Sequence, residues 1–243
     1  MKITTIGFWG AYPGQDSATS CYLIEQDNFR LVIDLGSGAL SKLQKYTDIP
    51  SINAVVISHF HNDHIADVGA FQYACFVQQQ LGNLSRSVPI YAGKDEAENF
   101  ASLNHEATEA VPIPKNQAFT VGPFKIETTM TEHPRPCYAL KISNQDRTIV
   151  YTADTAYFDE LVDFSREANL LIAECSFYKG MDGSGPGHMT SEECGTLASS
   201  ANVGSMWLTH LPHFGDHQQL LQEAKEVYTG LVKLTSEGQT WES

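Results

Sequence analysis

The sequence predicts an α/β protein in which two β-sheets pack together with helices on the outside. Strand-like runs outnumber helical ones in both halves, helices are interspersed among them, and no Ser- or Pro-rich linker divides the 243 residues. A chain of this length with 42% hydrophobic residues can bury a sizeable core. We therefore expect residues 1–243 to form a single domain.

In the first half, polar and glycine-rich turns separate short strands. The β-rich runs Cys21–Glu25 and Arg30–Asp34 flank a polar tripeptide, which predicts a hairpin. A glycine-rich break follows, and then a helical stretch reaches about Tyr46. The apolar, β-branched run Ala54–Ser58 predicts a buried strand. The next expected elements are a helix up to Gln80, a strand over Val88–Tyr91 and a short helix over Lys94–Ala101.

The second half alternates in the same way. Strands are expected over Phe124–Thr129, Tyr138–Ile142, Thr148–Thr152, Leu170–Ala173 and Met206–Thr209. Helices are expected over Phe158–Ala168, from Thr190 to about Ala201, and from Asp216 until Gly230 stops the last one. The start of the second helix is the most specific signal, because Thr190 followed three residues later by Glu193 is a capping box.

Charge and cysteine content exclude several functional classes. The net charge of −14 repels a long polyanion, so binding of long nucleic acids is disfavoured, whereas a small anion can be held where metal charge overrides the field. The five cysteines are odd in number and form no CxxC pair, which disfavours a zinc ribbon and a disulfide scaffold. The chain has no secretory hydrophobic region and no apolar run of the ~20 residues that span a membrane. A cytoplasmic location without membrane binding is expected.

The most informative segment is Ser58-His59-Phe60-His61-Asn62-Asp63-His64, directly after the buried strand. In an extended chain residues i and i+2 point to one side, so His59 and His61 can present imidazoles to one point. Asp63 and His64 follow where the chain turns into the next helix, and they can face a second point. Three histidines and an aspartate at the carboxyl end of a strand suit a pair of divalent metal ions.

This H-x-H-x-D-H pattern resembles the metallo-β-lactamase superfamily, whose fold is a four-layer αββα sandwich with the site along one edge of the two sheets. The resemblance implies three more ligands, in order, at the ends of later strands: His133, Asp154 and His210. It assigns one metal ion to His59, His61 and His133 and the other to Asp63, His64 and His210, with Asp154 as the bridging ligand. Nitrogen and oxygen ligands without a thiolate suit Zn(II) or Mn(II), and the sequence leaves that choice open.

Within the superfamily, the sequence looks most like ribonuclease Z and related phosphodiesterases. Zinc β-lactamases commonly carry Cys where Asp154 stands, and diiron oxygen reductases use Glu where His61 stands, so both activities are disfavoured. Glu174 and His188 match catalytic positions of the ribonuclease Z branch, where the glutamate supports a histidine that serves the leaving group. A structural carboxylate and a histidine in a glycine-rich loop are the alternative interpretations. The segment from His105 to Thr108 resembles the family's motif around the catalytic glutamate in its residue types. It precedes His133, however, which is the wrong position in the family's order of motifs, so we interpret it as a decoy on a helix or loop.

The implied activity is hydrolysis of a small phosphodiester, such as a cyclic or short nucleotide. Two metal ions would lower the pKa of a shared water toward ~7 and supply a hydroxide that attacks phosphorus. Asp63 would orient that hydroxide, and His188 would protonate the departing alkoxide.

Two other functions stay open: a ribonuclease Z-like nuclease acting on RNA ends, and a thioester or lactone hydrolase. Enzymes that mature precursor tRNA carry a long arm, which in the long-armed bacterial type lies between the third histidine and the bridging aspartate. Only 21 positions separate His133 from Asp154, which disfavours tRNA processing. The physiological substrate, the oligomeric state (a homodimer included) and any substrate contact by His213 or His217 are also open.

Overall fold

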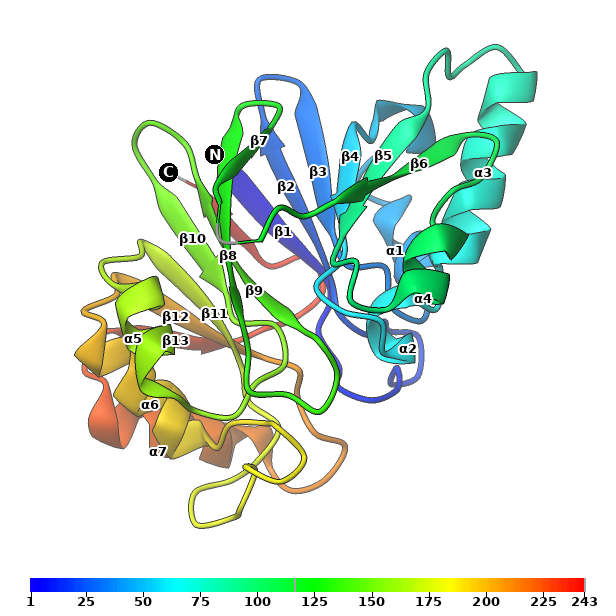
Figure 1. The fold of residues 1–243 in the computed structure, drawn as a ribbon. Helices are drawn as coiled ribbons and strands as arrows, with labels where there is room; N and C mark the ends of the chain where they lie inside the picture. The colour runs from blue at the N-terminus through cyan, green and yellow to red at the C-terminus, as the bar shows by residue number, and fades with distance from the viewer. Residues whose placement is uncertain (116, 243) are drawn as a thin grey trace. The chain divides into compact units, whose positions relative to one another are not determined.

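The computed structural model describes residues 1–115 and 117–242, which form two compact units (Figure 1). The first unit comprises residues 1–114, 121–123 and the residues from 236 onward, and the second comprises most of residues 115–235. Each unit is built on one seven-stranded sheet. In the described ranges, none of the helices combines the length and the apolar character needed to cross a membrane.

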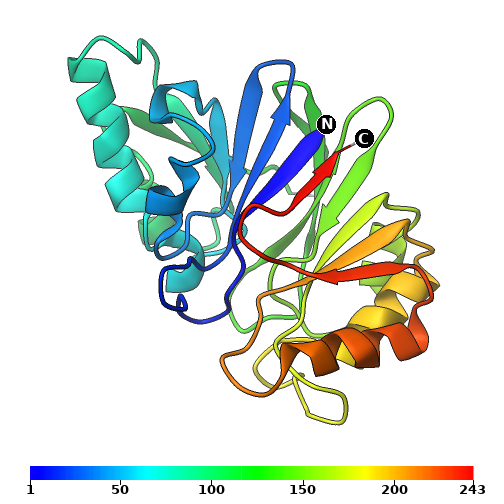
Figure 2. The ribbon, with the colours of Figure 1, turned by 180° about the vertical axis from the view of Figure 1, so that it is seen from behind.

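The sheet of the first unit has the strand order β14-β1-β2-β3-β4-β5-β6. Its strands are β1 (Lys2–Gly7), β2 (Cys21–Gln26), β3 (Phe29–Ile33), β4 (Ala54–Val56), β5 (Val88–Ala92), β6 (Thr108–Pro112) and β14 (Thr240–Glu242). Strands β14 to β3 pair antiparallel, whereas β3, β4, β5 and β6 run parallel. The last strand therefore lies beside the first at the sheet edge, as Figure 2 shows from behind.

Helices of the first unit close a hydrophobic core against this sheet. They are α1 (Ala39–Leu43), α2 (Asn62–Ile65), α3 (Val68–Gln80) and α4 (Ala97–Ser102), with a 3-10 turn over Ile49–Ser51. Leu43 of α1 and Phe71 of α3 are fully buried in one cluster with Val55 and Ile90 of the sheet. Burial of such side chains stabilises the unit by roughly 1.5–3 kcal/mol each, and it fixes the strand that leads into the histidine motif.

The second sheet has the order β13-β12-β11-β10-β9-β8-β7. Its strands are β7 (Phe119–Val121), β8 (Phe124–Met130), β9 (Tyr138–Ser143), β10 (Thr148–Tyr151), β11 (Leu170–Glu174), β12 (Ser205–Thr209) and β13 (Leu231–Leu234). The pairs β8–β9 and β9–β10 are antiparallel, and β10 to β13 are parallel. Because β8 thus runs in the same direction as β10, β11 and β12, these four strands end at one edge of the sheet.

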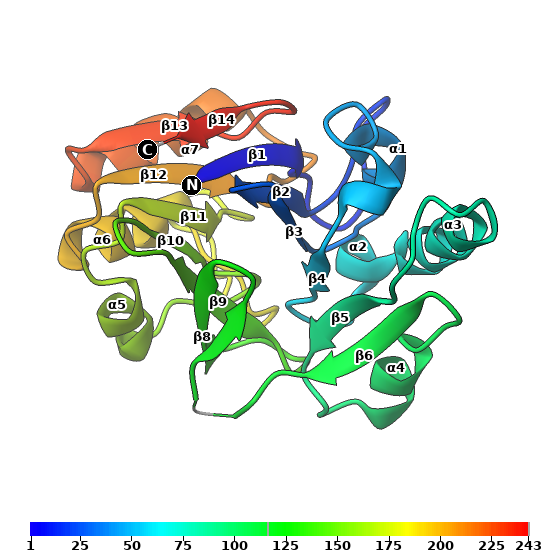
Figure 3. The same ribbon diagram turned by 90° about the horizontal axis from the view of Figure 1, so that it is seen from above.

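Helices α5 (Asp159–Ser165), α6 (Ser191–Ser200) and α7 (His217–Val227) gather on one side of this sheet (Figure 3). The predicted capping box is present, because Thr190 accepts from the Glu193 backbone N–H while the Glu193 side chain accepts from the backbone N–H of Thr190. Asp216 caps α7 as expected, through the backbone N–H of Gln218.

Candidate metal centre

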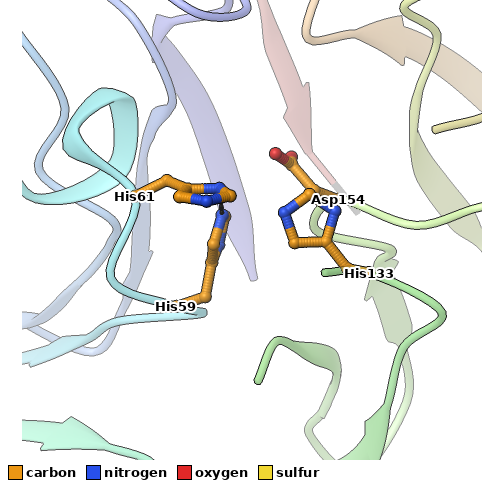
Figure 4. Close-up of side chains that lie close together, drawn as sticks. All are labelled: His59, His61, His133 and Asp154. Carbon is orange, nitrogen blue, oxygen red and sulfur yellow. Dashed lines mark hydrogen bonds between the residues drawn. The ribbon is translucent and has the colours of Figure 1, made fainter. Parts of the chain in front are cut away.

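In the first unit, the histidine motif starts two residues after β4 ends. Extended backbone carries the chain to His61, which is the N-cap of α2, and Asp63 and His64 lie inside that short helix. The His59 Nε2 and His61 Nδ1 atoms are 3.1 Å apart, as the dashed line in Figure 4 marks. Two nitrogens that bind one zinc ion at ~2.0–2.1 Å in tetrahedral geometry are separated by a similar distance. The predicted pairing of these two imidazoles is therefore present within this unit.

His64 is held by a buried carboxylate at the end of the neighbouring strand. Asp34, directly after β3, has one carboxylate oxygen 2.7 Å from His64 Nδ1, and both residues have fully buried side chains. The same carboxylate accepts from the backbone N–H and the hydroxyl of Ser58, at 2.8 and 2.9 Å. Ser58 Oγ in turn lies 3.1 Å from His59 Nδ1. Asp34 and Ser58 thus orient two imidazoles so that the Nε2 atoms point away from their supports.

The carboxylate of Asp63 is held by a backbone N–H. Its Oδ2 accepts from the backbone N–H of Ala11 at 2.9 Å, and it lies 3.7 Å from His64 Nε2. The loop after β3 approaches so closely that a Cβ on Gly36 would lie 2.1 Å from the Asp63 carbonyl oxygen. Only glycine fits at that position, because any side chain there would displace the backbone that carries Asp63 and His64.

The Asp34 contact leads to a testable expectation. Asp34→Asn keeps the shape and one acceptor oxygen but removes the charge that holds the His64 ring, so metal affinity should fall roughly 10- to 100-fold, the usual cost of losing an outer-shell partner. Competition with a chromogenic chelator measures the affinity. Asp27→Asn, at an exposed hairpin turn, makes the same charge change and should have no effect. Unaltered affinity in Asp34→Asn would show that this carboxylate does not support the ligand.

In the second unit, the other predicted residues lie where neighbouring strands end. His133 follows β8, Asp154 follows β10, Glu174 is the last residue of β11 and His210 directly follows β12. The ends of these four strands share one sheet edge, which brings the side chains together. Ala153 and His210 both adopt a positive φ, at 51° and 53°, a conformation that costs a non-glycine residue energy and is often found at functional sites.

His210 and Asp154 form a contact of their own. His210 Nε2 lies 3.3 Å from an Asp154 carboxylate oxygen, while its Nδ1 lies 2.8 Å from the hydroxyl of Ser176. Asp154 is 1% exposed. A buried carboxylate requires a compensating charge, which a divalent cation with a histidine co-ligand provides.

Glu174 and His188 form the predicted pair, with the carboxylate Oε1 2.9 Å from His188 Nδ1. Glu174 is fully buried, and it accepts backbone N–H bonds from Thr155, Ser176 and Met189. Its orientation is therefore fixed by the fold, and it fixes the imidazole in turn. The His188 ring stacks on His210 at 5.3 Å between centroids. Glu174, His188 and His210 each offer a ligand atom within 4.8 Å of the others.

His133 is held by a carbonyl from the glycine-rich loop. Its Nδ1–H donates to Gly187 O at 3.0 Å, and its ring lies 5.4 Å from that of His188 (Figure 4 draws His133 and Asp154). Burial lowers the pKa of His133, although the Asp154 charge and the Gly187 hydrogen bond oppose the shift. A lowered pKa favours the neutral imidazole, the form that binds a metal ion.

The remaining histidines of interest lie outside these contacts. His105 lies in the loop between α4 and β6, where it forms an isolated backbone bridge with Thr108, the first residue of β6. His217 is the first residue of α7 and donates to Pro212 O at 2.6 Å. His213 is half-buried in the loop after β12.

Across both units, one pattern fits metal ligation. In His59, His64, His133 and His210, Nδ1 lies against a hydroxyl, a carboxylate or a carbonyl, which leaves Nε2 for another partner. Such supports are typical of histidines that bind metal ions. The sequence reasoning missed the supporting residues Asp34, Ser58 and Ser176. For Asp34 a signal exists, an acidic residue at the carboxyl end of a strand, whereas the serines carry none.

Comparisons with known proteins agree with this chemistry. The profile of the beta-lactamase superfamily domain matches residues 30–211. The chain is 44% identical to the probable metallo-hydrolase YhfI of Bacillus subtilis, over the full length of both. The crystal structure of that metallo-beta-lactamase fold protein matches with a TM-score of 0.99 at 43% identity and covers 100% of this chain and 99% of the other. Ribonuclease Z of Haloferax volcanii is 23% identical over 100% of this chain and 95% of that protein.

Proposed function

Because the chain belongs to the metallo-β-lactamase superfamily and is therefore a metallo-hydrolase, we propose that it is a dinuclear phosphodiesterase for small phosphodiesters, such as cyclic or short nucleotides. The observation that carries this proposal is the Glu174–His188 pair, stacked against His210 at the edge where Asp154 lies. An alkoxide is a poor leaving group that needs a proton donor, and a carboxylate-oriented histidine is the usual donor.

The donor sets of the two units supply the ligands in this proposal. His59, His61 and His133 would hold one divalent ion and Asp63, His64 and His210 the other, with Asp154 bridging. When bound, the ions supply positive charge for the phosphoryl oxygens and an activated water. Imidazole and carboxylate donors without a thiolate suit Zn(II) or Mn(II). The supports at Nδ1 favour this assignment, because they fix each ring for ligation without using Nε2.

The chain's own residues have separate roles in this mechanism. Asp63, anchored by the Ala11 N–H, accepts the proton of the attacking water. His188 donates its Nε2 proton to the departing oxygen, while Glu174 holds Nδ1 and stabilises the cationic ring before the transfer. Glu174 accepts three backbone N–H bonds, so its carboxylate keeps one orientation throughout.

Two rival activities follow from the same residues. A nuclease acting on RNA ends is favoured by the similarity to ribonuclease Z, and a thioester or lactone hydrolase would use the same ligands without needing His188. Activity toward bis(p-nitrophenyl) phosphate, a thioester and a lactone, with Mn(II) or Zn(II) added, separates these classes. Hydrolysis of the thioester or lactone without hydrolysis of the diester would overturn the proposal.

Small diesters should be cleaved far better than a precursor tRNA. The net charge of −14 opposes a long polyanion, and only the β9–β10 hairpin and its flanking loops join His133 to Asp154. We expect kcat/KM for a cyclic nucleotide to exceed that for precursor tRNA at least ~100-fold at physiological salt, with lower salt widening the gap because screening weakens. Efficient trimming of the tRNA with weak action on diesters would reverse this ranking and favour the nuclease.

A further inference from the structure

A pocket of about 610 Å³ adjoins His133 within the second unit. Three segments line it: residues 132–134 after β8, residues 156–158 before α5, and residues 184, 185 and 187 of the glycine-rich loop that precedes His188. Its volume lies in the usual range of small-molecule sites, roughly 300–1,000 Å³. Because His133 belongs to both the pocket and the proposed ligand set, a molecule seated here would reach the reacting phosphate.

The walls of the pocket are pre-organised. The backbone N–H of Ala156 donates to Glu132 O at 2.9 Å, and the backbone N–H of Glu132 donates to the Thr155 hydroxyl at 3.2 Å. On the other side, Gly187 lies so close that a Cβ there would come within 2.7 Å of the Pro134 ring. Two walls are therefore tied to the segment that carries His133, and little ordering is needed when a ligand enters.

The lining is aromatic and, among the described residues, contains neither lysine nor arginine. Tyr157 and Phe158 are half-buried and offer ring surface, with Pro134 and Ala156 beside them. The one carboxylate that the described lining residues contribute is that of Glu132. Burial raises the pKa of Tyr157, and the negative charges of Asp159 and Glu193 raise it further. Such a pocket repels a second phosphate and favours a neutral, planar ring, which stacks on aromatic side chains.

We propose that this pocket, with Tyr157 and Phe158 as its stacking surface, binds the nucleobase of a nucleotide substrate. This inference rests on the proposed phosphodiesterase function and narrows its substrate class to nucleoside phosphodiesters. Exposed Glu132 accepts hydrogen bonds, so bases with an exocyclic amino group should be preferred to uracil and thymine.

Two measurements test the pocket, one of them independent of catalysis. Calorimetry compares the binding of adenosine with that of methyl riboside, which lacks the base. Kinetics compare 3′,5′-cyclic AMP with the cyclic phosphate of methyl riboside, which has the same reacting bonds. Adenosine should bind and methyl riboside should not. Phe158→Ala should weaken adenosine binding and raise KM for cyclic AMP roughly 10-fold, the effect of losing a stacked ring.

The controls separate ring stacking from general damage. Phe158→Tyr keeps the ring and should restore binding, and Tyr73→Ala, which removes a 62%-exposed ring on α3, should change nothing. Tyr157→Ala provides a second variant should Phe158→Ala lower the melting temperature. The base-free substrate should be insensitive to all of these changes.

The outcomes distinguish this inference from the function on which it rests. The pocket assignment would be overturned if adenosine and methyl riboside bound equally well, or if Phe158→Ala raised KM equally for both cyclic phosphates. Neither result would contradict the proposed phosphodiesterase activity. Ring-dependent adenosine binding without hydrolysis of either cyclic phosphate would overturn the proposed activity and leave the pocket as a nucleoside site.

Discussion

Asp154→Ala should remove most of the bound metal from a protein that otherwise holds close to two ions per chain. Asp154 is the proposed bridging ligand, and it is also a buried carboxylate beside His210 whose charge needs compensation by a cation. Without it, neither ion keeps its full donor set, so we expect kcat for a small diester to fall by at least ~10³-fold, comparable to losing the main electrostatic stabilisation of a transition state. Elemental analysis after loading with Mn(II) or Zn(II) gives the stoichiometry.

A matched control is available in the turn between β9 and β10. Asp146 is exposed, and Asp146→Ala makes the same substitution away from the strand ends that carry the ligands. It should retain both ions and full activity. Asp154→Ala removes a buried charge, so its melting temperature in the absence of metal should not fall. A wild-type protein that binds at most one ion under every loading condition would refute the bridging assignment.

The sequence could point to candidate metal ligands because their signals are local. Four of them follow one strand within six residues, and the others stand in a fixed order at strand ends. The membership of the chain in the superfamily and its metallo-β-lactamase fold are confirmed by the match over residues 30–211 and by the likeness to the YhfI structure, whereas the ligand assignments stay predictions. The supports could not be predicted in this way. Asp34 contacts His64 from 30 positions away, and Ser176 contacts His210 from 34 positions away, so only pairing of strands brings them together.

The strands that were missed are the short strands β6, β7, β13 and β14. Strands β6, β13 and β14 form through neighbours in their sheets, and β13 and β14 expose several of their side chains, so none shows a clear alternation of apolar and polar residues. Two helices end earlier than predicted. Helix α1 ends at Leu43, after which the chain forms turns with hydrogen bonds such as Lys45 N–H to Lys42 O. Helix α5 ends at Ser165, and Glu167, two residues later, has a positive φ. These local turns depend on packing, which periodicity does not report.

The aromatic pocket shows the same limit at the site itself. Tyr157 and Phe158 lie three and four positions after Asp154, yet no motif marked them, because their role depends on the loops at residues 132–134 and 184–187. A ligand motif specifies the chemistry of the reacting centre. The walls that select a substrate are contributed by loops, whose contacts arise only in the folded unit.

His188→Ala should slow hydrolysis of diesters most where the leaving group is most basic. The Glu174 carboxylate orients the His188 ring for proton donation, and an alkyl or ribose oxygen leaves poorly without that proton. We expect a loss of roughly 10²–10⁴-fold for such substrates, the usual size of general-acid catalysis. A p-nitrophenolate needs little protonation, so bis(p-nitrophenyl) phosphate should lose far less. The ratio of the two losses, measured as kcat, is the diagnostic quantity.

Metal content and a matched variant complete the test. Because His188 is assigned as an acid and not a ligand, His188→Ala should retain both ions, and His105→Ala, in the loop before β6, should match the wild type on both substrates. Glu174→Gln should reproduce the leaving-group dependence more weakly, because the ring would remain but lose its charged support. Equal losses on both diesters with intact metal would make His188 a binding residue. A lost ion would make it a ligand, which its position with Glu174 and His210 within 4.8 Å allows, and the assignment of His210 would then change.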